Sequence, residues 1–367
     1  MTEMTERELL VGEERALVKL RSLYKSYGYL PYKMSKFEEY DLYAGNKDFL
    51  VSDRVITFND TDGKLLALKP DVTLSIIKNS VADGEKRKVY YNENVYRVSK
   101  STGQFKEIMQ AGLECIGEVD ITDVFEVVTL AARSLECISP DYVLDLSHMG
   151  ILSALLSELP DSLSGRISSL IADKNAHELT SLCAEQGISP ELAEALVALA
   201  SLYGSIPSVL ERLLPLCKTE EVLAAYAELS SLCELIMNTG LSSHVRLDFS
   251  VVNNMSYYNG IVFRGFLSGI SEGVLAGGEY GRLLSGMHRS GDAIGFAIYL
   301  DLISELLSEA RATDVDVLLL YKSGEEREML KRKEELISTG KSVLSSKIIP
   351  KGIRYGECVT LGGDENA

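Results

Sequence analysis

Two polar residues of one apolar segment are spaced so that they could bind a ligand together. Gln110 and Glu114 lie four positions apart in EIMQAGLECIG, and alternation along a strand places both on the same face. A Gln and a Glu on a face with few other charges are costly to bury without partners. Either they hydrogen-bond each other or a nearby Tyr, or they bind a polar ligand. We favour the ligand.

A second polar group precedes this segment. In LKPDVT (68–73), Asp71 and Thr73 offer a carboxylate and a hydroxyl that can accept hydrogen bonds from an ammonium. The alternative for Asp71 is that it caps the helix that follows. Arg97 carries a guanidinium fork that suits a carboxylate or a phosphate, and its alternative role is a surface ion pair.

Strands and helices must position these side chains. Lys88–Tyr96 and Ile108–Cys115 are predicted to be strands around the polar loop SKSTGQF, and residues 53–69 a hairpin around NDTDG. Helices are expected at 13–28 and 121–137. Further strands are expected at 142–146, 245–251, 257–267, 274–280 with a glycine turn, and 293–299 running into a helix.

The intervening segment and the C-terminal part have different patterns. Residues 148–242 are rich in Leu, Ala, Ser and Glu with helical spacing and are punctuated by prolines, which predicts an all-helical insertion. The last residues predict a strand, a helix and two short strands. The sequence therefore predicts an α+β body at 1–147 and 243–310, the helical insertion at 148–242, and a small α/β unit at 311–367.

Composition limits the functional classes. The 367 residues are 46% hydrophobic and 25% charged, as in globular proteins, and no apolar run reaches about 18 residues. The N-terminal MTEMTERELL lacks the order of a signal peptide, so we expect a cytoplasmic protein. Six cysteines without CxxC spacing predict free thiols and no metal site. A net charge of −17 disfavours tRNA as a partner.

Taken in order, five motifs resemble the histidyl-tRNA synthetase-like regulatory subunits of ATP phosphoribosyltransferase, a family of histidine biosynthesis. The resemblance covers about residues 10–310 and implies a class II aminoacyl-tRNA synthetase-like antiparallel sheet flanked by helices. The motifs are LKPDVT (68–73), YRVSKSTGQFKEIMQAGLE (96–114), YYNGIVF (257–263), AGGEYG (276–281) and GFAIYLDLI (295–303).

The resemblance also implies roles in a relict histidine pocket. Asp71 and Gln110, with Thr73, would hold the ammonium, and Arg97 would hold the carboxylate. Glu114 would read the imidazole. Tyrosines with polar tips suit packing against that ring, although most sheet tyrosines belong to the core. The matching tyrosines are Tyr257, Tyr258 and Tyr280.

Several positions depart from the synthetase pattern. Leu302 and Asn253 stand where arginines would contact ATP, and Ser99 replaces a carboxylate. The loss of one group that stabilises transferring phosphate typically costs about 10²–10³ in rate. Further departures are Ser35, Glu279 and Gly281, and the 62 residues after Glu305 are few for an anticodon-binding domain.

These departures favour a regulatory subunit over an enzyme. The expected protein has no catalytic residue and no cofactor, and it binds free histidine. Its expected partners are a second copy of itself and the short-form catalytic subunit, with neither tRNA nor a membrane. The alternatives are an active histidyl-tRNA synthetase and a free-standing amino-acid-binding paralogue.

Overall fold

The computed structural model describes residues 12–47, 50, 54–79, 86–98, 103–252, 257–307 and 313–361. The chain contacts divide it into two compact units. The larger is Ala16–Ile303, and the smaller combines Met1–Arg15 with Ser304–Ala367. The larger unit carries every residue that the sequence predicts to bind a ligand.

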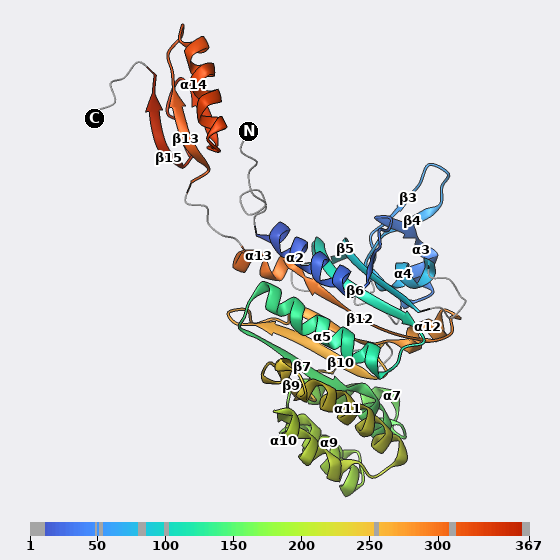
Figure 1. Cartoon of the computed structure of the whole chain (residues 1–367). Coiled ribbons are helices and arrows are strands. Elements are labelled where there is room, and N and C mark those ends of the chain that lie inside the picture. The colour runs from blue at the N-terminus through green and yellow to red at the C-terminus, as the bar shows by residue number, and fades with distance from the viewer. Residues whose placement is uncertain are drawn as a thin grey trace. The chain divides into compact units, whose positions relative to one another are not determined.

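A large mixed sheet forms the centre of the larger unit (Figure 1). Its strands are β1 (Leu30–Pro31), β5 (Arg87–Val98), β6 (Phe105–Gly117), β7 (Tyr142–His148), β8 (Tyr203–Gly204), β9 (Val245–Asp248), β10 (Ile261–Leu267), β11 (Leu275–Glu279) and β12 (Asp292–Tyr299). The order is β1-β5-β6-β12-β11-β10-β7-β9-β8. Neighbours are antiparallel except the pairs β1–β5 and β7–β9.

Two helices, α2 (Glu13–Ser26) and α5 (Ile121–Ile138), run along one face of this sheet (Figure 1). Tyr24 of α2 is fully buried, and its hydroxyl lies 3.0 Å from Ser134 Oγ of α5. Helix α5 starts at a capping box in which Asp120 and Asp123 exchange side-chain and backbone hydrogen bonds. The apolar packing of this layer fixes the position of the central strands.

The other face of β5 and β6 packs against α4 (Thr73–Asn79) and α12 (Gly281–Gly286). Strand β6 is therefore buried on both faces from Gln110 onward. Its side chains alternate between the two faces, so its polar side chains share one of them. The shared core cluster includes Leu74, Ile76, Ile77, Val89, Val95, Leu283 and Leu284.

A small antiparallel sheet precedes α4 in the chain and positions its first residue. It consists of β2 (Phe37–Glu39), β4 (Leu65–Leu68) and β3 (Thr57–Asn59), with α3 (Tyr40–Ala44) beside it. The β3–β4 turn is closed by Asp60, whose Oδ1 accepts hydrogen bonds from the N–H groups of Asp62 (2.9 Å) and Lys64 (2.8 Å). A short connection that contains Pro70 joins β4 to α4.

The segment between β7 and β9 is helical, apart from β8 at the sheet edge. Its α-helices are α6 (Met149–Leu156), α7 (Asp161–Ala172), α8 (Ala176–Glu185), α9 (Pro190–Ala200), α10 (Ile206–Leu213) and α11 (Glu220–Met237), with 3₁₀ turns η2 (Leu214–Leu216) and η3 (Gly240–Ser243). His148 caps α6 by accepting from Gly150 N at 3.1 Å, and its Nε2 lies 3.1 Å from Glu228 Oε2 of α11. This pair ties α11 to the end of β7.

The smaller unit holds a parallel sheet of order β14-β13-β15 that packs against helix α14. The elements are β13 (Val315–Leu320), α14 (Glu326–Ser338), β14 (Val343–Ser346) and β15 (Tyr355–Thr360). Leu319, Met329 and Leu361 form its small core. Helix α13 (Leu300–Leu307) follows β12 and continues into this unit.

The predicted α+β class is confirmed, and two local predictions are wrong. The strand expected at 257–267 begins only at Ile261, because the N–H of Asn259 turns to the backbone oxygen of Glu279 (3.0 Å). The glycine turn expected after β11 is the first turn of α12.

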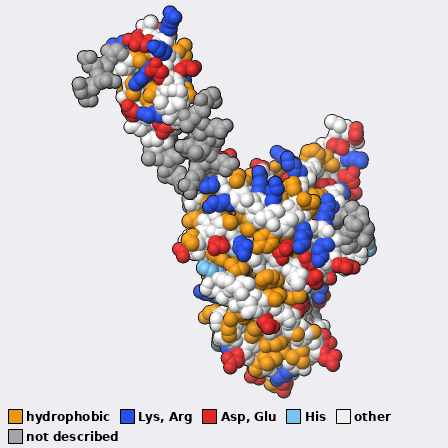
Figure 2. Space-filling model, viewed as in Figure 1, with side chains coloured by type: hydrophobic (Ala, Val, Ile, Leu, Met, Phe, Trp, Pro, Cys, Tyr) orange, Lys and Arg blue, Asp and Glu red, His pale blue; other side chains and the backbone are white. Residues whose placement is uncertain are grey.

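Some of the surface cations of the larger unit are paired with carboxylates. Figure 2 shows Lys and Arg side chains grouped over the region of α2 and β5. Two lysines at the start of β5 are paired with α5: Lys86 lies 2.5 Å from Asp123, and Lys88 lies 2.8 Å from Glu126. Such pairing reduces the positive field that a polyanion would meet.

A buried ion pair beside α4 should contribute measurably to stability. Lys69 is fully buried, its Nζ lies 2.8 Å from Glu93 Oε2, and Glu93 is 16% exposed. Glu93→Ala leaves a buried ammonium without its partner and should lower the free energy of unfolding by on the order of 2–4 kcal/mol. Urea unfolding would measure it.

The matched control is the exposed pair Lys64–Glu39, with side chains 65% and 59% exposed. Glu39→Ala should cost less than about 1 kcal/mol. Equal losses in the two variants would show that burial of Lys69 is not what makes its partner important.

Candidate functional site: a polar cavity on the central sheet

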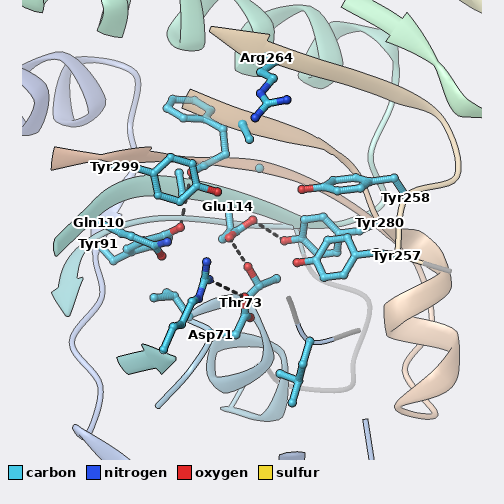
Figure 3. Close-up of a pocket in the computed structure, with 17 residues that line it drawn as sticks. Asp71, Thr73, Tyr91, Gln110, Glu114, Tyr257, Tyr258, Arg264, Tyr280 and Tyr299 are labelled. Atoms are coloured by element: carbon cyan, nitrogen blue, oxygen red, sulfur yellow. Dashed lines mark hydrogen bonds and ion pairs between the residues drawn. The ribbon is translucent and has the colours of Figure 1, made fainter. Parts of the chain in front are cut away.

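A cavity of about 390 Å³ lies on the face of the sheet that α4 and α12 partly cover. All eight predicted binding residues line it, and Figure 3 shows the labelled side chains around one space. The lining residues are Leu50, Asp71, Val72, Thr73, Tyr91, Arg97, Gln110, Glu114, Tyr257, Tyr258, Arg264, Ala276, Tyr280, Gly295, Phe296, Ala297 and Tyr299.

Glu114 is held at the centre of this cavity by two hydroxyls. Its Oε1 accepts from Thr73 Oγ1 at 2.8 Å and its Oε2 from Tyr280 OH at 2.5 Å. The residue is 2% exposed, and burial raises the pKa of the Glu114 carboxyl to about 8, although the two hydrogen bonds oppose this shift. The site therefore holds a carboxyl group that is largely protonated below about pH 8.

A glycine makes room for this carboxylate. Gly295 of β12 pairs directly with Glu114, and a Cβ there would lie 1.7 Å from Glu114 Oε2. On the same face, a Cβ at Gly112 would lie 2.6 Å from the hydroxyl oxygen of Tyr91. Gly295 thus leaves space in the cavity for the Glu114 carboxyl, and Gly112 leaves space for the Tyr91 hydroxyl.

Asp71 combines the helix-capping role with a position in the cavity wall. Its Oδ1 accepts from Leu74 N at 3.0 Å, which caps α4, while Oδ2 lies 3.9 Å from Arg97 Nη2 beside the cavity. Burial raises the pKa of the Asp71 carboxyl, and the Arg97 charge opposes that shift. Arg97 also donates from Nε to Pro70 O at 2.8 Å, so it is part of the cavity wall rather than a surface ion pair.

Gln110 and Glu114 share the cavity face of β6, as the alternation requires. Three tyrosines form the wall opposite Gln110 (Figure 3). The ring of Tyr257 lies 4.5 Å from that of Tyr258 and 5.8 Å from that of Tyr280. Burial raises the pKa of all three phenols well above the usual value, so they remain neutral and can donate hydrogen bonds.

Sequence reasoning missed three polar residues of the cavity: Tyr91, Arg264 and Tyr299. Tyr91 pairs with Gly112 across β5–β6, and Tyr299 pairs with Gln110 across β12–β6. Pairing partners share a face, so the strand order would have identified both tyrosines. Arg264 lies three strands from β6, and alternation along β10 was the available signal.

The departures from the synthetase pattern fall at several places. Leu302 is a half-buried residue of α13, and Ser35 lies between β1 and β2. Glu279 accepts from Ile261 N at 2.6 Å, and burial raises the pKa of its carboxyl to about 7. Gly281 opens α12. Ser99 and Asn253 lie outside the described residues.

A cluster of metal ligands or a long apolar helix would indicate another kind of function. Among the described residues, no group of three or more His, Cys, Asp or Glu side chains could hold a metal ion. Likewise, no helix within the described part of the chain is both long and apolar enough to cross a membrane.

The sheet with its flanking helices defines a class II aminoacyl-tRNA synthetase-like fold. The crystal structure of an ATP phosphoribosyltransferase regulatory subunit/histidyl-tRNA synthetase from Bacillus halodurans C matches with a TM-score of 0.80 at 23% identity, covering 98% of this chain and 99% of that one. Histidyl-tRNA synthetase from Nostoc sp. PCC 7120 matches with a TM-score of 0.71 at 17% identity, covering 94% and 85%.

The sequence model of the histidyl-tRNA synthetase family matches residues 7–303, and the chain belongs to this family. It is 25% identical over 346 residues to the ATP phosphoribosyltransferase regulatory subunit of Oceanobacillus iheyensis, covering 92% of this chain and 85% of the relative. For the protein of that name from Alkaliphilus metalliredigens, the identity is 28% over 327 residues, covering 85% and 82%.

A third solved structure is a complex. A chain of the ATP phosphoribosyl transferase (HisG:HisZ) complex from Thermotoga maritima matches with a TM-score of 0.62 at 22% identity. The match covers 78% of this chain and 96% of that one. The resemblance inferred from the five motifs is thereby confirmed.

The raised pKa of Glu114 predicts a pH-dependent stability. A carboxyl whose pKa is higher in the folded than in the unfolded state stabilises the fold below the unfolded value, here near 4.5, and loses this contribution as the pH rises through about 8. The free energy of unfolding should therefore fall between about pH 5 and about pH 8.5, and Glu114→Gln should reduce the fall. Urea unfolding at several pH values would measure both profiles.

Glu107→Gln is the control, because Glu107 is an exposed residue of the same strand. It should keep the wild-type profile. Parallel profiles for wild type and Glu114→Gln would mean that Glu114 does not titrate in this range.

Proposed function

We propose that the chain is a non-catalytic regulatory subunit of ATP phosphoribosyltransferase that binds free histidine in the cavity and transmits feedback to a short-form catalytic subunit. The observation that carries the proposal is an asymmetry between the cavity and a position expected to contact ATP. The amino-acid side retains its carboxyl, amide and hydroxyl groups in one cavity, whereas Leu302 occupies a position where an ATP-binding arginine is expected. The names of the curated relatives support the same role, as does the match to a chain of the Thermotoga complex.

The cavity chemistry suits an amino acid with a heteroaromatic ring. Asp71 and Gln110 can accept hydrogen bonds from an ammonium, and Arg97 lies beside Asp71 for the carboxylate. Glu114 can exchange a hydrogen bond with an imidazole nitrogen in either protonation state, since its pKa is about 8. The ring would pack among the tyrosines. Histidine would then act by favouring one state of the complex over another.

The first test concerns catalysis. Leucine at position 302 cannot bind a phosphate, so histidine-dependent exchange between pyrophosphate and ATP should stay at background. A known histidyl-tRNA synthetase serves as the positive control. Exchange clearly above a no-enzyme control would favour the alternative, an active synthetase.

The second test concerns feedback and uses the complex assembled with the catalytic subunit. Glu114→Ala and Gln110→Ala should each raise the histidine concentration needed for half-inhibition by roughly 5- to 150-fold, which corresponds to about 1–3 kcal/mol for a lost hydrogen bond to a buried or charged group. ATP phosphoribosyltransferase activity as a function of histidine concentration is the measurement.

Glu107→Ala is the matched control, because Glu107 lies on the same strand outside the cavity. It should leave inhibition unchanged. If the Glu114 and Gln110 variants assemble normally and are inhibited like wild type, histidine is sensed elsewhere.

A further inference from the structure

The cavity contains a cation that the proposed histidine contacts leave unused. Arg264 of β10 lines the cavity but remains exposed at its rim. Among the described residues, no hydrogen bond or ion pair is found for its guanidinium, which lies 5.8 Å from the Phe266 ring centroid. Its stem rests against Gly273, where a Cβ would lie 2.3 Å from Arg264 Nε. The Arg264 side chain is therefore packed against Gly273, and no ion pair within the described residues neutralises its charge.

Arg97, the other arginine of the cavity, is in a different situation. Its side chain is 13% exposed, it donates to Pro70 O, and it faces the Asp71 carboxylate. Much of its charge is therefore balanced within the wall. Arg264 has no such counter-charge among the lining residues near it. Its cross-strand neighbour Asp145 of β7 lies outside the cavity lining, and no ion pair joins the two side chains.

The strand order places Arg264 far from the amino-acid end. Strands β6 and β10 are separated by β12 and β11, and three strand spacings amount to about 14 Å. Between them, the row that contains Arg264 holds only Ala276, Ala297 and Gly112. Figure 3 shows Arg264 at one end of the cavity, Asp71 and Thr73 at the other, and Glu114 between them.

We propose that Arg264 determines the charge selectivity of the pocket by excluding amino acids with cationic side chains. The inference rests on the proposed function, because it takes Asp71 and Arg97 as the anchor for the ammonium and carboxylate. A side chain anchored there extends past Glu114 toward Arg264. In its ionised form, Glu114 would attract the side chains of lysine and arginine. An imidazole ends at Glu114, whereas a longer cationic chain approaches the Arg264 guanidinium and is repelled.

Arginine and citrulline provide the matched ligand pair, because they have nearly the same shape and differ in charge. The full-length protein, alone and assembled with the catalytic subunit, would be titrated with each ligand by calorimetry and by competition with labelled histidine. Wild type should bind arginine more weakly than citrulline by roughly 10-fold, the effect expected for a like charge in a partly screened cavity.

Arg264→Gln should bind arginine about 10-fold more tightly than wild type does, with little change for citrulline, and Arg264→Glu should extend that gain. Arg246→Gln is the control. Arg246 is exposed on β9, in the same row of the sheet as Arg264, but outside the cavity. It should retain the wild-type arginine affinity.

The outcomes separate the two proposals. Arginine affinity that is unchanged in both Arg264→Gln and Arg264→Glu overturns the selectivity role, even if histidine binds normally. An equal gain in Arg246→Gln also overturns it, because the effect would then reflect net charge. Failure of histidine to bind wild type in the assembled complex refutes the proposed function itself and, with it, the anchor on which the selectivity role depends.

Discussion

The buried carboxyl of Glu114 is the constraint around which the rest of the larger unit is arranged. A carboxyl at this depth is tolerated because Thr73 and Tyr280 each donate a hydrogen bond to it. Those hydroxyls come from α4 and from the end of β11, and Gly295 of β12 leaves the space that the carboxyl fills. Four segments that are distant in sequence must therefore dock correctly before this one group is satisfied. Any shift of α4 would also move Asp71, which caps it.

A ligand site also requires unfilled space, and the residues of the sheet provide it. The central strands carry helices on one face, so their apolar side chains are used there, while small residues occupy the cavity face. Gly295, Ala276 and Ala297 are small lining residues of the cavity, and Glu114 is the polar side chain at its centre. The volume of about 390 Å³ is thus a consequence of residue size and register.

Some of the predicted cavity residues have local signals, whereas Arg97 and the three tyrosines were identified through the family resemblance. The residues that were missed depend on long-range pairing. Gln110 and Glu114 share a face by alternation within one strand, and Asp71 stands at a recognisable helix start. Arg264 enters the cavity because β11 and β12 lie between β10 and β6, an order that no local pattern encodes. The start of β10 was misplaced for a related reason, since Asn259 and Ile261 bond to Glu279 of another strand. Secondary structure and the α+β class follow from periodicity, whereas strand order is decided by packing of the whole sheet.

Charge placement gives the proposed function its physical logic. Asp71 and Arg97 lie side by side and can match the opposite charges of an amino acid's backbone. Glu114, with a pKa of about 8, can complement either a neutral or a protonated imidazole at little cost. Without a further cation, however, the ionised form of Glu114 would also attract the side chains of lysine and arginine. On the selectivity proposal, Arg264 at the far end offsets this attraction, and the shorter imidazole does not reach it. Selectivity on this proposal arises from the distance between two charges, which the strand order fixes.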